Sequence, residues 1–173
     1  TAVLMALVFS AFGQSKSVDK FRNTHDPDLK LFFYKSTLKM YARLSTNLTG
    51  DLQPDDSGEI PDLSRLIEGI EKVKFFSYDP GSLNADLMTQ LNTDVKGEGY
   101  ESVMNARMNA ANIEILMKEK RSKPVGFVVL INSEEGEMIL DLEGMPDLSN
   151  LMKLSDFMSS NTESFNLLKN AFN

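Results

Sequence analysis

The chain has 173 residues, of which 42% are hydrophobic and 25% are charged, and it contains no cysteine. Its 25 acidic residues outnumber its 18 Lys and Arg, which gives a net charge of −7 and a pI near 4.8. This composition indicates one globular domain. It excludes disulfides, thiolate catalysis and cysteine-ligated zinc, and it argues against nucleic acid as a partner, because binding a phosphate backbone requires concentrated Lys and Arg.

The N-terminal segment is an uncharged apolar run over residues 2–12, AVLMALVFSAF. It is too short to span a bilayer. Ala11 and Gly13 occupy the −3 and −1 positions before Gln14, which is the small-residue pattern of a signal-peptide cleavage site. The alternative is a buried N-terminal segment. We expect a cleaved signal peptide over 1–13, a mature domain over 14–173 with no transmembrane segment, and a periplasmic or secreted location.

The next elements alternate between helix and strand. Residues 18–23 fit a short helix, and the following His25, Asp26 and Pro27 close it. Alternating apolar residues predict a strand over 29–34, and helical spacing then resumes near Ser36, whose hydroxyl could cap the first turn. Residues 46–60 are polar and acidic with Gly and Pro, which predicts a mobile loop.

A second helix, strand and helix follow in order. Pro61 begins an amphipathic helix whose apolar stripe ends at Ile70. A strand over 73–76 precedes a helix with Ser82 as its expected N-cap, and glycines 97 and 99 end that helix. Residues 100–107 could form a further strand that turns at 108–111.

The central stretch from Ala111 to Leu142 determines the fold class. Residues 112–118 alternate like a half-buried strand, residues 125–131 are apolar like a central strand, and residues 138–142 alternate again. The segments that join these three runs are too short for a βαβ crossover, so the three strands must pair antiparallel. We expect an α+β domain with a mixed, mainly antiparallel sheet of about five or six strands and helices packed on it.

Two apolar patterns remain after the sheet. Pro146 begins a closing helix that extends to Met158. The tail over 159–173 places Phe165, Leu168 and Phe172 at helical spacing, so it could pack on the body of the protein or associate with another molecule.

The candidate sites have simpler structural interpretations. His25 is the only histidine, and no serine near it lies in a G-x-S-x-G context. The carboxylates of Asp51, Asp55, Asp56, Glu59 and Asp62 could hold calcium, but their spacing does not fit an EF-hand loop. Glu134, Glu135 and Glu137 fit an exposed hairpin turn. The sequence therefore assigns no catalytic, cofactor-binding or metal-binding residue.

Several strings resemble the DUF4252 family of exported Bacteroidetes proteins of unknown function. They are LKLFFYKSTLKMYARL over 29–44, residues 67–79, Gly99-Tyr100-Glu101 leading into NIEILMKEK at 112–120, and residues 140–151 ending in DLSNL. The resemblance covers about residues 18–158. It implies a Gram-negative envelope protein and brings no catalytic residues. Many members carry a cysteine after the signal peptide, as lipoproteins do, whereas this chain has Gln14.

Three functional hypotheses remain open. The first is a non-enzymatic binding module that contacts another envelope protein or a small apolar ligand. The second is a hydrolase that uses carboxylates or a metal from residues 51–62. The third is a structural protein that self-associates through Phe165–Phe172. No cofactor is expected, and the sequence leaves the oligomeric state open.

Overall fold

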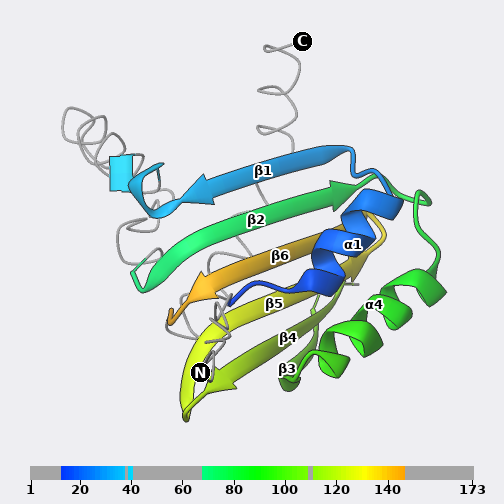
Figure 1. The fold of residues 1–173 in the computed structure, drawn as a ribbon. Helices are drawn as coiled ribbons and strands as arrows, with labels where there is room; N and C mark the ends of the chain where they lie inside the picture. Colours follow the sequence, from blue (N-terminus) through cyan, green and yellow to red (C-terminus); the bar gives the residue numbers. More distant parts are fainter. Residues whose placement is uncertain (1–12, 38, 41–67, 109–110, 147–173) are drawn as a thin grey trace, which may run out of the picture.

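The computed structural model describes residues 13–37, 39–40, 68–108 and 111–146. Within these ranges the named elements are two helices and six strands (Figure 1). In chain order they are α1 (Lys16–Thr24), β1 (Leu29–Tyr34), β2 (Ile70–Tyr78), α4 (Ala85–Gly97), β3 (Tyr100–Met108), β4 (Ala111–Lys120), β5 (Lys123–Ser133) and β6 (Gly136–Gly144).

The six strands form one sheet in the order β1-β2-β6-β5-β4-β3. Strands β3 to β6 form a continuous meander, and β6 then pairs with β2. Helix α4 carries the chain from β2 to the far edge, so that β3 pairs with β4 and not with β2. The sheet of about five or six mainly antiparallel strands that we expected is confirmed with six. The parallel component of a mixed sheet is absent among the described strands, because the crossover from β2 to β3 does not return beside β2.

The turn between β4 and β5 shows why this hairpin closes tightly. Arg121 and Ser122 have φ values of 53° and 60°, both in the left-handed region. Two successive residues of this kind make a type I′ turn, whose twist matches that of the flanking strands. The sequence predicts a break over residues 121–124, but Lys123 and Pro124 already belong to β5, so the break is a two-residue turn.

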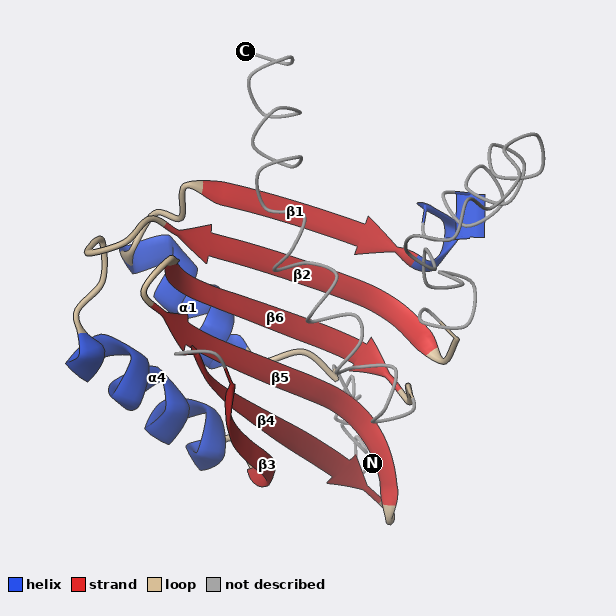
Figure 2. Cartoon of the chain, turned by 180° about the vertical axis from the view of Figure 1, so that it is seen from behind, coloured by secondary structure: helices blue, strands red, loops and turns tan. Residues whose placement is uncertain are grey.

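Helices α1 and α4 lie on the same face of the sheet, which we call the helix face (Figures 1 and 2). Its buried apolar side chains come from both helices, their connecting segments and five strands: Val18, Phe21, Phe76, Tyr78, Leu83, Met88, Leu91, Val95, Tyr100, Leu116, Val128, Leu130 and Ile139. The opposite face has its own buried cluster: Leu29, Ile70, Val73, Phe75, Ile115, Phe127, Val129, Ile131, Met138, Leu140 and Leu142. The central strands are thus apolar on both faces, which explains the uninterrupted apolar run of β5.

Two helix boundaries differ from the sequence prediction. Asn84, not Ser82, is the N-cap of α4, because its side-chain oxygen accepts a hydrogen bond from Leu87 N at 2.9 Å. Ser82 lies in the preceding turn, where its N–H donates to the Asp79 carbonyl at 3.0 Å. Ile70, which we expected in a helix, is the first residue of β2 and pairs with Gly144.

Other predicted features lie outside the described residues. These are the apolar run over 2–12, the acidic loop over 46–60, most of the helix from Pro61, and the segment after Pro146 with its tail over 159–173. Helical backbone at residues 35–37 and 39–40 agrees with the predicted start near Ser36.

Candidate functional site

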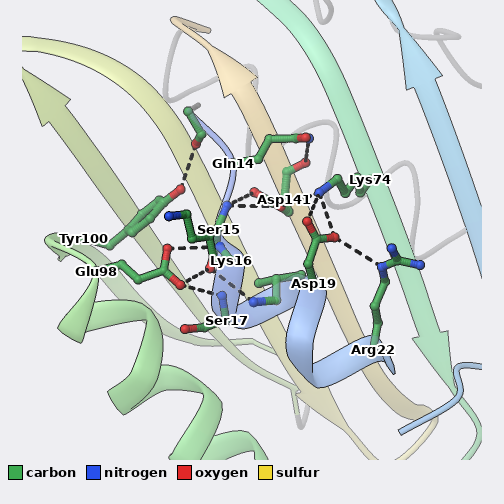
Figure 3. A network of polar contacts seen from close by, with 12 residues as sticks. Gln14, Ser15, Lys16, Ser17, Asp19, Arg22, Lys74, Glu98, Tyr100 and Asp141 are labelled. Atoms are coloured by element: carbon green, nitrogen blue, oxygen red, sulfur yellow. Dashed lines mark hydrogen bonds and ion pairs between the residues drawn. The ribbon is translucent and has the colours of Figure 1, made fainter. Parts of the chain in front are cut away.

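A buried carboxylate, Asp141, lies on the helix face of β6 with no exposed surface. Both of its carboxylate oxygens accept from the Ser15 N–H, at 3.2 and 3.3 Å. The side-chain amide of Gln14 donates to the Asp141 main-chain carbonyl at 3.4 Å (Figure 3). The first described residues of the chain are therefore bound to the middle of the sheet.

Lys74 joins this carboxylate to α1. Its ammonium lies 3.6 Å from Asp141 Oδ2 and 2.8 Å from each oxygen of Asp19. Arg22 adds a second cation to Asp19, with Nε 3.2 Å from Oδ1. A chain of alternating charges thus connects β6, β2 and α1.

Glu98, which follows the last turn of α4, binds the start of α1. It accepts from the Ser15 hydroxyl at 3.2 Å, from the Lys16 N–H at 3.0 Å and from the Ser17 N–H. The Ser15 hydroxyl oxygen accepts in turn from Val18 N at 3.2 Å, so Ser15 is the N-cap of α1. A carboxylate at a helix N-terminus is stabilised by the unpaired N–H groups and the helix dipole.

Gly13 packs directly against the sheet. The Tyr100 hydroxyl donates to the Gly13 carbonyl at 2.7 Å. A Cβ atom added to Gly126 on β5 would lie 1.7 Å from that same carbonyl oxygen. Only a residue without a side chain permits this approach, so Gly126 is required for the docking of the N-terminal segment.

Burial and neighbouring charge shift the pKa values in this region. Burial raises the pKa of Asp141 to about 7, although Lys74 and the Ser15 N–H act in the opposite direction. Burial also acts to raise the pKa of Asp19, but the hydrogen bonds and charges of Lys74 and Arg22 outweigh it, and the pKa is lowered. The pKa of Tyr100 is raised by burial and by Asp141, Glu98 and Glu143.

These contacts define what we call the Asp141 network, formed by Gln14, Ser15, Asp19, Arg22, Lys74, Glu98 and Asp141. The charged side chains in it bind one another or backbone N–H groups. Among the described residues, no group of three or more His, Cys, Asp or Glu could hold a metal ion. The network therefore fixes α1 and the N-terminal segment on the sheet.

A second feature lies at the β1 edge of the sheet. Phe32 and Tyr34 are 41% and 54% exposed, although both are aromatic. The Arg22 guanidinium lies 5.6 Å from the Phe32 ring centroid, and the Lys72 ammonium lies 5.4 Å from the Tyr34 ring centroid. We call Phe32, Tyr34, Arg22 and Lys72 the β1 aromatic patch. Cations over aromatic faces are typical of recognition surfaces as well as of simple packing.

The structure gathers none of the described candidate residues from the sequence into a possible metal site. His25 ends α1, where its backbone N–H and its Nδ1 contact the Phe21 carbonyl and its ring packs on Phe21 at 4.6 Å. Glu134 and Glu135 lie in the exposed turn between β5 and β6, but Glu137 is a buried residue of β6, only 7% exposed, so its expected exposure was wrong. The carboxylates at 51–62 lie outside the described residues.

Sequence reasoning missed Asp141 and Lys74. Each is the one charged residue inside an otherwise apolar strand segment, MILDL and VKFF. Both lie on the helix face, where α1 and the N-terminal segment cover them and make them buried partners. The available signal was one charge inside each of these two apolar segments, of opposite sign in the two.

The fold is that of an α+β protein, with an antiparallel sheet, two helices on one face, an anchored N-terminal segment and an aromatic edge. Its described part holds no recognisable catalytic constellation. The chain belongs to the family described as "Domain of unknown function (DUF4252)", whose profile matches residues 34–154. The match includes all six strands apart from most of β1. Neither the curated proteins nor the solved structures contain a significant match to this chain. No helix in the described part is long and apolar enough to cross a membrane.

Proposed function

We propose that this protein is an exported, non-enzymatic binding module of the bacterial envelope. Export is supported by the apolar run over 2–12 and the small residues Ala11 and Gly13 before Gln14. The binding role is supported by the β1 aromatic patch, because exposed aromatic side chains at a sheet edge are a common feature of protein interfaces.

The partner that fits this edge is an extended segment of another protein that carries acidic and apolar side chains. Within the described part, β1 is an edge strand, so its outer backbone groups can pair with an added strand. Residues 29–40 contain three lysines and no acidic residue, although the whole chain has a net charge of −7. Two of these lysines already pair with Asp26 and Glu71, while Arg22 and Lys72 lie over the exposed rings.

The hydrolase alternative lacks support from the described residues. Its carboxylates at 51–62 lie outside them, and Asp141, which is fully buried, already binds Lys74 and the Ser15 N–H. Self-association through Phe165–Phe172 also concerns residues outside the described ranges, so no observation favours it.

Site-specific photo-crosslinking in intact cells tests the proposed edge. A crosslinker at Tyr34 should capture a protein partner, and the same group at Val103, which is 39% exposed on the opposite edge strand β3, should not. Tyr34→Ser should weaken the binding of the captured partner, while Val103→Ser should leave it unchanged. Equal capture at both edges, or binding that is insensitive to Tyr34→Ser, would remove the β1 edge as the binding surface.

A further inference from the structure

The chain enters the fold at Gly13, Gln14 and Ser15, which is where the sequence pattern predicts that a signal peptide is cut. All three residues are buried, and Gln14 is only 8% exposed. The Gly13 backbone lies against Val125 and Gly126, so closely that a Cβ on Gly13 would be 1.9 Å from the Val125 carbonyl oxygen. A peptidase could not reach the bond between Gly13 and Gln14 in this state, so any cut there must come before folding.

Three carboxylates surround this segment. Asp141 binds the Ser15 N–H, and Glu98 binds the Ser15 hydroxyl (Figure 3). The Cγ atom of Glu143 would lie 3.1 Å from a Cβ on Gly13. Burial and the negative charges of the same three carboxylates raise the pKa of the Tyr100 hydroxyl, which donates to the Gly13 carbonyl.

A buried cation near the segment, Lys74, is shared by two carboxylates. Lys74 is closer to Asp19, at 2.8 Å, than to Asp141, at 3.6 Å. Lys118 lies over the Tyr100 ring, 5.2 Å from its centroid. The Lys16 side chain belongs to an exposed residue. The surroundings of Gln14 are therefore acidic, and they suit a cationic group.

We propose that the chain is cut between Gly13 and Gln14 and that the new α-ammonium group of Gln14 stays docked on the sheet as a cationic partner of Asp141. In the cut, water adds across the amide bond, Gly13 leaves as a carboxylate on the leader, and Gln14 keeps the amine, which binds a proton at neutral pH. This inference rests on the proposed export, which supplies the signal peptidase.

The docked position also opposes a side reaction of N-terminal glutamine. Cyclisation would join the α-amine to the side-chain carbonyl carbon and release the side-chain nitrogen as ammonia. In the structure that nitrogen donates to the Asp141 carbonyl, so the side chain is held by the sheet. The folded protein should keep an uncyclised terminus with a positive charge.

The pH dependence of amine labelling is the direct test. A chain that begins at Gln14, released from a carrier by a protease and then folded, is treated with an amine reagent across pH, and the labelled terminus is quantified by mass spectrometry. An α-amine normally has a pKa of about 7.7–8.0, which nearby carboxylates raise and burial without a partner lowers. We expect a pKa at least about one unit above that of the unfolded chain, which means an about tenfold smaller reactive fraction near neutral pH. An unchanged or lowered pKa, or a terminus that has lost ammonia, overturns the inference.

Variants show whether the α-amine pKa reflects pairing with Asp141 or only the burial of the terminus. Asp141→Asn should lower the α-amine pKa toward its ordinary value, while Glu134→Gln in the exposed β5–β6 turn should not change it. Glu143→Gln, which removes a more exposed carboxylate, provides the same comparison if Asp141→Asn does not fold. If neither Asp141→Asn nor Glu143→Gln changes the pKa of the Gln14 α-amine, the proposed pairing is contradicted.

The first residue of the protein recovered from its native cells tests the cut. A start at Gln14 supports the inference, and any other first residue overturns it. Retention of the leader with the protein inside the cell would overturn export as well. A Gln14 start with an unraised α-amine pKa would overturn the docking alone and leave the export proposal intact.

Discussion

Lys74 and Asp141 stand directly opposite each other on β2 and β6, with the ammonium 3.6 Å from the carboxylate in a place where Asp141 has no exposed surface. The lysine also holds Asp19 on α1 at 2.8 Å. One buried cation therefore serves two carboxylates, and both depend on it, because a buried charge without a partner is costly.

Replacing Lys74 with Met should destabilise the protein strongly. Met fills a similar volume, but it leaves the fully buried Asp141 without its cation and Asp19 with Arg22 alone. Breaking a buried pair from one side typically costs about 3–5 kcal/mol. Urea unfolding of the variant and of the wild type measures this difference in the free energy of unfolding.

The matched control for Lys74→Met is Lys35→Met. Lys35 pairs with Glu71 on the surface, where both side chains are about half exposed. Exposed pairs contribute about 0–1 kcal/mol, so this variant should unfold almost like the wild type. Similar losses in the two variants would contradict the special position of Lys74.

The stability of the protein should fall as the pH rises from about 4 to about 7. The folded state raises the pKa of Asp141 from 3.8 to about 7 through burial, so it favours the protonated form. A raised pKa contributes stability that is present below the unfolded value and is lost as the pH rises through the folded value. Thermal unfolding at a series of pH values should place the maximum midpoint on the acid side of neutrality.

Two variants identify the source of that pH dependence. Asp141→Asn should cost least near pH 8 and flatten the decline, because the neutral side chain no longer has to ionise. Asp19→Asn should do the opposite, since a lowered pKa contributes stability above the unfolded value that is lost as the pH falls. A wild-type midpoint that rises steadily from pH 5 to pH 8 would argue against a raised Asp141 pKa.

Much of the fold follows from local sequence patterns, whereas the Asp141 network depends on contacts between residues far apart in the chain. The strand alternation at 29–34 and 112–118, the break that begins at Arg121 and the helix stop at Gly97 depend on neighbouring residues, so the sequence predicts them. The pairing of β2 with β6 joins residues far apart along the chain. Only that pairing brings Lys74 opposite Asp141, so no local pattern could identify the two as partners.

The N-cap of α4 illustrates the limit of local prediction. Ser82 and Asn84 are both good capping residues, and the sequence favoured Ser82 because it precedes the apolar spacing from Leu83. Leu83 is buried without belonging to the helix, since it fills the core cluster of the helix face from the preceding turn. Tertiary packing therefore moved the helix start by two residues.

Asn84→Ala should destabilise the protein by about 1 kcal/mol, because it removes the side-chain acceptor of the Leu87 N–H. Ser82→Ala should have a smaller effect, since the Ser82 bond to Asp79 comes from its backbone N–H, which alanine keeps. Thermal unfolding of both variants gives the order. The reverse order would restore Ser82 as the effective cap.

Gly126→Ala tests the close contact between the N-terminal segment and the sheet. In a chain that retains Gly13, the added Cβ would lie 1.7 Å from the Gly13 carbonyl oxygen, so the segment must move away from β5 and weaken both the Tyr100 hydrogen bond and the Ser15 contact with Asp141. Such overpacking typically costs about 1–3 kcal/mol in the free energy of unfolding.

Gly97→Ala is the control, because a Cβ there meets nothing within 4 Å and alanine favours the last turn of α4. Urea unfolding should therefore show a loss for Gly126→Ala and a neutral or slightly stabilising effect for Gly97→Ala, and equal effects would mean that residues 13–15 do not rest on β5.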